Sequence, residues 1–221
     1  MERMERTDPG TDDFYRRYAE HLATHPESTR SAMLPAIEAA LPRGSRVLDV
    51  GAGAGRDVAG MLVAGLDAYG VEPSEEMRGR ALVQFPELRG RLREGALPDL
   101  GHPFDDAAPE GFDGVVCSAV LMHVGEEALA EALAALAGTL RRSADGRHAA
   151  AGTVMLLSLP EQLDGSLAEG RDVDGRRFVN HAPDRVAALL ATMGFSLVAH
   201  AVSDAVLSAT GTRWHQLTLR R

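Results

Sequence analysis

The fold is decided by the stretch Val47-Leu48-Asp49-Val50-Gly51-Ala52-Gly53-Ala54-Gly55-Arg56. It begins inside a short apolar run, Arg46–Val50, of the kind that forms a buried strand in a parallel sheet. The glycines that follow allow the backbone to turn sharply and to approach a ligand without a Cβ atom in the way. A helical pattern covers Arg56–Ala64, and the free N–H groups at the start of a helix attract a carboxylate or a phosphate. The stretch therefore predicts a strand, a ligand-binding turn and a helix.

Strand and helix patterns alternate on the C-terminal side of this unit. Further strands are expected at Ala68–Val71, Leu92–Glu94, Gly111–Ser118, Gly152–Leu159, Ser196–Val202 and Trp214–Leu219. Helices are expected from Ser74, as the cap, to about Phe85, over Glu126–Leu140 and over Ala182–Met193. Repeated strand–helix units predict an α/β fold with a mostly parallel sheet and helices on both faces. Because no helical pattern separates the last two strands, the final strand is expected to run antiparallel.

Two segments do not follow this alternation. The stretch Asp12–Leu41 is typical of two helices interrupted near His25-Pro26, with Ser28 as a candidate cap of the second helix. We expect residues 1–44 to form an N-terminal helical cap and residues 45–221 to form the main domain. The polar and glycine-rich loop 161–180 is too long for a plain connection and is expected to be a substrate lid.

The composition narrows the range of functions. The 221 residues carry a net charge of −9, which disfavours general binding to nucleic acid because phosphate contacts need concentrated basic side chains. The sequence contains no lysine, so Schiff-base chemistry on lysine is excluded. Its single cysteine, Cys117, excludes an intramolecular disulfide and a multi-cysteine zinc site, and no metal is expected. Without a signal-like N-terminus or a run of roughly 18 apolar residues, we expect a cytoplasmic protein with no membrane partner.

A second motif is the acidic residue Glu72, which ends the second expected strand in Tyr69–Ser74. A carboxylate at this place can accept hydrogen bonds from both hydroxyls of a ribose. The glycine turn by itself suits a dinucleotide or a nucleoside. Dinucleotide sites with the G-x-G-x-x-G pattern need a small residue where this chain has Arg56. The G-x-G-x-G pattern behind Asp49 therefore favours the nucleoside over a nicotinamide dinucleotide.

These motifs resemble those of the class I S-adenosylmethionine-dependent methyltransferases, and specifically the small-molecule enzymes with a domain of the ubiquinone-biosynthesis type. Later stretches resemble the later motifs of the family: Glu94–Pro98, Phe112–Ser118 with its continuation Val120–Val124, and Phe178–Phe195. The resemblance implies a Rossmann-like three-layer sandwich with a seven-stranded sheet. It also implies S-adenosyl-L-methionine as cofactor and O-, N- or C-methylation of a small-molecule acceptor, and it leaves the oligomeric state open.

The resemblance further implies a cofactor-binding set that extends from the N-terminal helix to the fourth strand. The amino-acid end of the cofactor would lie in the glycine motif, at Asp49, Gly51, Ala52, Gly53, Gly55 and Arg56. The ribose would be bound by Glu72, and the adenine would lie near Pro73, Met77, Ala96 and Leu97. Ser118 and Leu121 would form the floor beneath the sulfonium, and Tyr15 and Tyr18 would cover the cofactor. In the third motif, Gly95-Ala96 stands where the family usually has an Asp or Asn for the adenine amine.

Methyl transfer from a sulfonium is an in-line displacement that depends mainly on positioning. A general base helps when the acceptor is a hydroxyl or a protonated amine, and His123 is the best-placed candidate, with a structural histidine as the other interpretation. Trp214 and His215 are interpreted as packing residues, with His215 pointing outward.

Two other functions stay open. The first is a non-catalytic sensor or partner subunit that binds the cofactor, although the intact glycines and Glu72 argue against it. The second is a methyltransferase acting on a macromolecule. The acidic charge, and the tetrad Ser118-Ala119-Val120-Leu121 in place of an Asn-Pro-Pro-Tyr-like one, argue against methylation of a nucleic-acid base.

Overall fold

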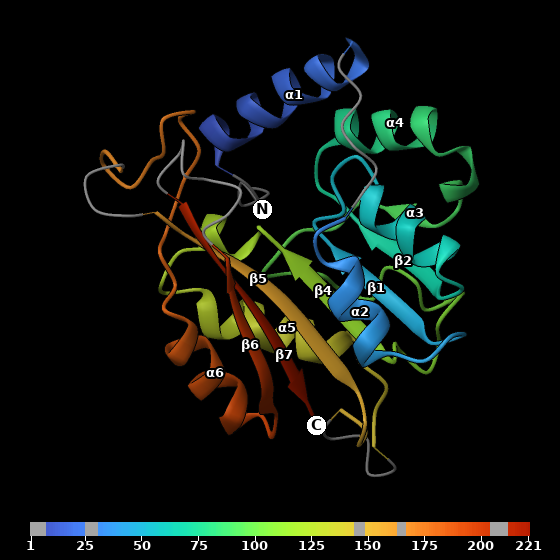
Figure 1. Cartoon of the computed structure of the whole chain (residues 1–221). Coiled ribbons are helices and arrows are strands. Elements are labelled where there is room, and N and C mark those ends of the chain that lie inside the picture. The colour runs from blue at the N-terminus through green and yellow to red at the C-terminus, as the bar shows by residue number, and fades with distance from the viewer. Residues whose placement is uncertain (1–7, 25–30, 144–148, 163–166, 204–211) are drawn as a thin grey trace, which may run out of the picture.

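The computed structural model of the chain describes residues 8–24, 31–143, 149–162, 167–203 and 212–221. These residues contain one seven-stranded sheet with the order β3-β2-β1-β4-β5-β7-β6 (Figure 1). The strands are β1 (Arg46–Val50), β2 (Asp67–Val71), β3 (Leu92–Arg93), β4 (Gly114–Ser118), β5 (Val154–Gln162), β6 (Ser196–Ser203) and β7 (Thr212–Arg220). Only β7 pairs antiparallel, with β5 on one side and β6 on the other. The predicted Rossmann-like α/β fold and its antiparallel last strand are confirmed.

Helices cover both faces of the sheet. They are α1 (Pro9–Thr24), α2 (Leu34–Ala40), α3 (Arg56–Val63), α4 (Glu75–Gln84), α5 (Leu129–Thr139) and α6 (Pro183–Thr192). Short 3₁₀ turns lie at Pro86–Leu88 and Leu121–His123. Figure 1 shows α2 in front of the sheet and α5 behind it. None of the described helices combines the length and the apolar character that crossing a membrane requires.

The two faces are built from alternate residues of the same strands, because successive side chains of a strand point to opposite sides. In β4, Val115 and Cys117 lie in the hydrophobic cluster that contains α5 and α6. Val116 lies in the opposite cluster, together with Ile37 of α2 and Val58 of α3. Both clusters are fully buried at these positions, so the central strands read as continuous apolar runs.

Most predicted elements are present, with shifted ends. The helix expected from Glu126 begins only at Leu129, without a side-chain cap, and β5 extends to Gln162, into the expected lid. The Ser74 hydroxyl accepts a hydrogen bond from the Met77 N–H and caps α4 as predicted. The predicted cap Ser28 lies outside the described residues. At the start of α2, the Ser31 hydroxyl instead accepts from the N–H groups of Met33 and Leu34.

The two N-terminal helices have different positions. Helix α2 packs on the sheet through Ile37, whereas α1 lies across the carboxyl ends of the strands (Figure 1). The C-terminal part of α1 packs against Met77 of α4 through Ala19 and Leu22. The N-terminal part of α1 lies away from α4 and makes a separate set of contacts.

An ion pair is the first of these contacts. Both carboxylate oxygens of Asp8 accept hydrogen bonds of 2.8 Å from the Arg171 guanidinium, and this bidentate contact holds the pKa of Asp8 well below its usual range. Next to it, the Thr11 hydroxyl accepts from the Arg177 backbone N–H at 3.0 Å. The Arg176 guanidinium lies 4.4 Å from the centre of the Phe14 ring. We call the contacts of Asp8, Thr11 and Phe14 with residues 171–177 the latch.

We expect Arg171→Ala to loosen α1 without unfolding the sheet. A bidentate pair of partly exposed groups contributes on the order of 1 kcal/mol, which corresponds to roughly fivefold faster amide hydrogen exchange in α1. Arg16→Ala is the matched control, because Arg16 pairs with Asp13 of the same helix. Exchange rates of residues 9–24 that respond equally to both substitutions would disprove the latch.

Candidate functional site

A cavity of about 760 Å³ lies between α1 and the carboxyl ends of the strands. Its centre is where β1 has β2 on one side and β4 on the other, the point of reversed strand order at which α/β sheets bind ligands. Most of the predicted site residues line it: Tyr15, Tyr18, Asp49, Gly51, Ala52, Gly53, Arg56, Glu72, Pro73, Met77, Ala96, Leu97, Ser118 and His123. Gly55 and Leu121 are not among the lining residues. Gly55 faces Leu88 and Ala81 and begins α3 in a left-handed conformation, while Leu121 is buried in the core.

The glycine turn is held by hydrogen bonds to the neighbouring strand. The N–H groups of Gly51 and Ala52 both donate to the Val71 carbonyl, at 2.9 and 3.0 Å. Gly51 has a φ of +80°, and a Cβ atom at this position would collide with the Val120 side chain. Position 51 therefore requires glycine both for its conformation and for the space that Val120 occupies.

Glu72 is fixed by the backbone on both sides. One carboxylate oxygen accepts from the Gly53 N–H and the other from the Ser74 N–H, both at 2.9 Å. The residue is only 6% exposed, and this burial raises its pKa in spite of the two N–H groups. Each oxygen keeps a lone pair, so the carboxylate can still accept two hydroxyls of a ligand.

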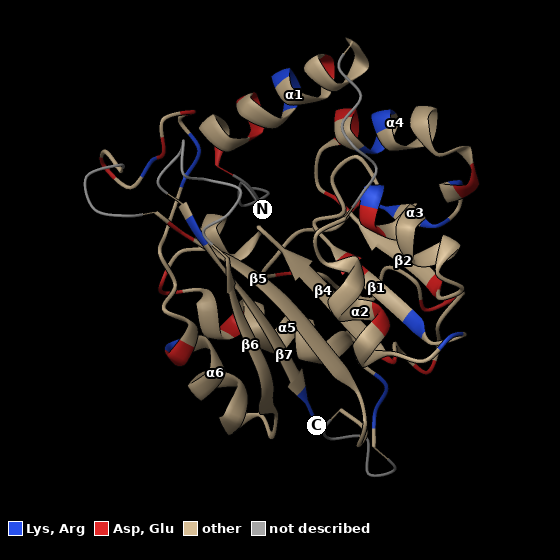
Figure 2. Cartoon of the chain, in the orientation of Figure 1, with Lys and Arg blue, Asp and Glu red and all other residues tan. Residues whose placement is uncertain are grey.

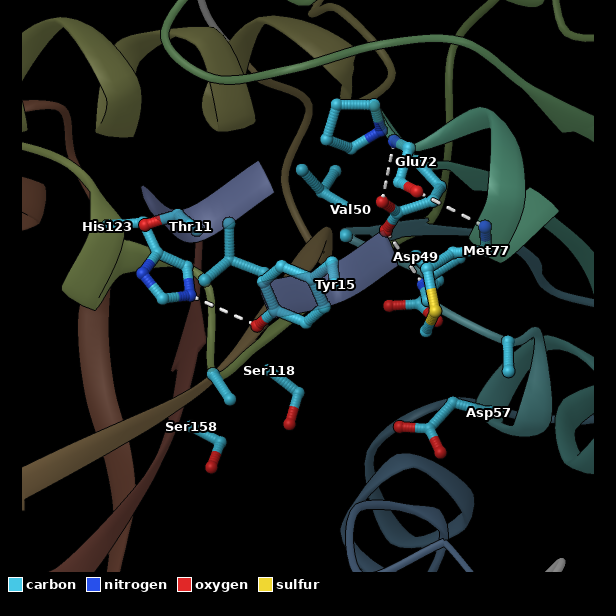
Figure 3. Close-up of a pocket in the computed structure, with 18 of the residues that line it drawn as sticks. Thr11, Tyr15, Asp49, Val50, Asp57, Glu72, Met77, Ser118, His123 and Ser158 are labelled. Carbon is cyan, nitrogen blue, oxygen red and sulfur yellow. Dashed lines mark hydrogen bonds between the residues drawn. The ribbon is translucent and has the colours of Figure 1, made fainter. Parts of the chain in front are cut away.

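Three carboxylates gather in this half of the cavity, at Asp49, Asp57 and Glu72 (Figure 3). Asp49 is 2% exposed. Its burial, with the charges of Asp57 and Glu72, raises its pKa well above the usual range, and Arg56 offsets this only in part. Asp57 pairs with Arg56 at 3.4 Å, but three carboxylates beside one such cation leave this half of the cavity negative, which favours a positively charged ligand and repels a pyrophosphate.

A hydrogen-bonded pair of rings stands at the middle of the cavity. The distance from the Tyr15 hydroxyl to His123 Nε2 is 3.1 Å, and His123 Nδ1 lies 2.7 Å from the Arg177 carbonyl oxygen (Figure 3). Because a carbonyl only accepts, Nδ1 carries the hydrogen, and Nε2 of the neutral ring accepts from Tyr15. Burial lowers the pKa of His123 and raises that of Tyr15, which keeps both rings uncharged near neutral pH.

The other half of the cavity contains residues that sequence reasoning missed. Ser158 of β5 and Trp214 and Gln216 of β7 line it beside Ser118. The available signal was a serine in the otherwise apolar run of β5, but its neighbours on β7 follow only from the strand register. The interpretation of Trp214 as a packing residue was therefore incomplete.

The expectation that His215 points outward was wrong. His215 is buried, and its ring lies within hydrogen-bond distance of Glu161 and His200 on the two flanking strands. It alternates with Gln216 and so lies on the opposite face of the sheet from the cavity. Among the described residues, no group of three or more His, Cys, Asp and Glu side chains is arranged to hold a metal ion.

Comparisons with known proteins point to one family. A family model described as a methyltransferase domain matches residues 16–200. A comparison with curated protein sequences finds no match.

Several solved structures share the fold. The 1,6-didemethyltoxoflavin-N1-methyltransferase of Burkholderia thailandensis is similar with a TM-score of 0.66 and 21% identity, covering 96% of this chain and 86% of that one. A TehB-like SAM-dependent methyltransferase of Corynebacterium glutamicum has a TM-score of 0.61 and 18% identity, covering 97% and 100%. Magnesium protoporphyrin IX methyltransferase of Synechocystis PCC 6803 has a TM-score of 0.60 and 20% identity, covering 96% and 84%.

We expect Asp49→Asn to stabilise the ligand-free protein at neutral pH. A carboxyl whose pKa is raised in the folded state binds its proton more tightly there than in the unfolded chain, so its ionisation destabilises the fold. The free energy of unfolding at pH 7 should rise by about 1.4 kcal/mol for each unit of the raised pKa that the substitution removes. The difference from the native protein should shrink as the pH falls towards 4.

The control is Asp106→Asn, because Asp106 is exposed and paired with Arg93, which lowers its pKa. This variant should show no gain in stability. Urea unfolding at several pH values measures both effects, and equal stability of Asp49→Asn and the native protein at pH 7 would contradict the electrostatic interpretation.

Proposed function

The chain belongs to the methyltransferase-domain family, and we propose that it transfers the methyl group of S-adenosylmethionine to a small-molecule acceptor by O-, N- or C-methylation. One observation carries the choice of cofactor, namely the buried carboxylates of Asp49, Asp57 and Glu72 beside the glycine turn. S-adenosylmethionine has a positive sulfonium and a positive ammonium group, and its ribose has two hydroxyls. A site with this charge suits such a ligand and opposes the pyrophosphate of a nicotinamide dinucleotide. The bound cofactor or product in several relatives supports the same choice.

We assign each part of the cofactor to a group of residues. The glycine turn, with Asp49, Ala52 and Arg56, holds the amino-acid end, and Glu72 accepts the ribose hydroxyls. Pro73, Met77, Ala96 and Leu97 would hold the adenine. Ser118, supported by Leu121 from the core, would form the floor beneath the sulfonium, and Tyr15 and Tyr18 would cover the cofactor from α1. Gly55 contributes by placing the start of α3.

Catalysis by these residues rests on positioning. Bound S-adenosylmethionine supplies an electrophilic methyl group, and the protein holds donor and acceptor in line. We propose His123 as the general base, acting through Tyr15 because Nε2 accepts from the Tyr15 hydroxyl. An acceptor proton would pass to the Tyr15 oxygen while the Tyr15 proton passes to His123 Nε2.

The two rival functions have less support. A sensor without catalysis would not need the Tyr15–His123 pair. A nucleic acid would meet scattered arginines, which Figure 2 shows spread over helices, loops and strand ends. We therefore propose that nucleic acid is not a partner. We also propose a cytoplasmic protein without a membrane partner.

The cap and the lid are also part of the proposal. Within residues 1–44, the helix α1 closes the cavity, and residues 45–221 form the domain that binds the cofactor. The loop 161–180 contributes Arg171, Arg176 and Arg177 to the latch. We propose that this loop moves with α1 when ligands enter. This movement would make loop 161–180 a substrate lid.

Isothermal titration tests the cofactor. S-adenosylmethionine should bind with micromolar affinity, and NAD should not bind. Glu72→Gln should weaken the binding of S-adenosylmethionine at least tenfold, since it removes charge and acceptor capacity worth about 1.5–3 kcal/mol. Glu75→Gln, an exposed change three residues away, is the control. Equal affinities of both variants would remove Glu72 from the site.

The pH dependence of turnover tests His123. Since its pKa is lowered, the base is neutral above that pKa, so kcat/KM should rise with pH through a value below 6.5 and then stay level. An acceptor found by screening with labelled cofactor allows the measurement. His123→Asn should lose this acidic limb and at least a hundredfold in kcat. An unchanged limb in the variant would identify His123 as structural.

A further inference from the structure

Three polar side chains form a row on one face of the sheet. The strand register pairs Ser118 of β4 with Ser158 of β5, and Ser158 with Gln216 of β7. Ser118 and Ser158 follow Val116 and Leu156 by two residues, so each serine lies on the same face as that neighbour, the face that carries α2 and α3. At Val116 and Leu156 the face is buried in the core, whereas one step further along both strands it borders the cavity. Figure 3 shows the two serine hydroxyls side by side and pointing the same way.

The Ser158 hydroxyl lacks a partner. The residue is only 5% exposed, and among the residues that the structure describes its side chain makes no hydrogen bond. Its oxygen is not among the fully buried, unpaired polar atoms of the described residues, so it is open to the cavity and free to bind a ligand there. Gln216 donates to the Ala32 carbonyl and keeps its amide oxygen as an acceptor. The row therefore presents donors and acceptors to whatever fills this half of the cavity.

The charges around the row are compensated. Arg176 is the cation that lines the cavity nearest to α1, and its guanidinium binds Asp172 at 2.6 Å and Asp174 at 3.6 Å. His123 is neutral, since it donates to a backbone carbonyl and accepts from Tyr15. A carboxylate, phosphate or ammonium group in this half would lose its water without gaining a partner of opposite charge.

The remaining walls are aromatic and aliphatic. Trp214 and Tyr15 contribute ring surfaces, and Met33, Val120 and Val124 contribute apolar ones. Flat apolar walls with a few polar atoms at one edge suit a ring compound with polar substituents. Ser118 is already assigned to the floor beneath the sulfonium, so the row extends from the reacting centre outwards.

We propose that Ser158, with Ser118 and Gln216, forms the acceptor subsite, and that the acceptor is an uncharged aromatic compound with hydroxyl or carbonyl groups on one edge. The oxygens of that edge bind the row, and the ring lies against Trp214. This inference deepens the proposed function and rests on it, because the subsite adjoins the cofactor half of the cavity. Ser158 is thus a specificity-determining residue that has no part in cofactor binding.

The test uses the only tryptophan of the chain, Trp214, as a fluorescent reporter. Protein saturated with S-adenosylhomocysteine is titrated with uncharged hydroxyarenes of one and two rings, with 2,3-dihydroxynaphthalene first. Its 6-sulfonate is the charged match. The uncharged compound should quench Trp214 saturably and bind at least tenfold more tightly than the sulfonate.

Ser158→Ala should weaken this binding three- to tenfold, the effect of one neutral hydrogen bond, and should leave the affinity for S-adenosylhomocysteine within twofold. Its melting temperature should be equal or higher, because the variant loses no hydrogen bond of the ligand-free protein. Ser196→Ala, an exposed serine at the start of β6, is the matched control.

The possible results separate the two proposals. Absence of quenching by every uncharged hydroxyarene, equal affinity for the sulfonate, or an unchanged affinity in Ser158→Ala would each overturn the acceptor subsite. If S-adenosylhomocysteine binds normally in these cases, the proposed function stands. If S-adenosylhomocysteine itself does not bind, the proposed function fails and the subsite fails with it.

Discussion

The N–H groups of Gly51 and Ala52 share one acceptor, the carbonyl of Val71, and the rest of the site depends on this contact. It turns the chain at the end of β1 towards β2, which brings the Gly53 N–H within reach of Glu72 and leaves room for Val120 from the end of β4. Residues from three strands are thereby held at one point by backbone groups rather than by flexible side chains. A ligand that binds there meets a surface that is already in place, so little conformational entropy is lost on binding.

The cavity has two electrostatic environments with Tyr15 between them. On one side, Asp49, Asp57 and Glu72 concentrate negative charge in a place with little water, and the fold tolerates this at some loss of stability. On the other side, the groups around Ser158 are neutral or compensated. This difference in charge between the two halves suits an enzyme that binds one cationic ligand and one uncharged ligand. Each ligand is then directed to its own half by electrostatics before any detailed contact forms.

Local patterns were enough to predict the elements near the glycine turn. Val47–Arg56 and the Ser74 cap depend on neighbouring residues in the chain, and the structure has them as predicted. The predictions were weaker where contacts between residues far apart in the sequence determine a residue's position. Asp8 and Arg171 are 163 residues apart, and the position of Gln216 beside Ser158 follows from the register of an antiparallel strand. Motif spacing also does not say which way a residue faces, which is why Gly55 packs on Leu88 instead of lining the cavity and why His215 points inward.

Helix α1 has a double role, because the same helix closes the cavity and carries Tyr15. If α1 swings away to exchange ligands, as proposed above, His123 would lose the hydroxyl from which its Nε2 accepts. The open form would then lack the proposed proton path, and closure would assemble it. An acceptor would be activated only after both ligands are enclosed, which would limit unproductive loss of the methyl group to water.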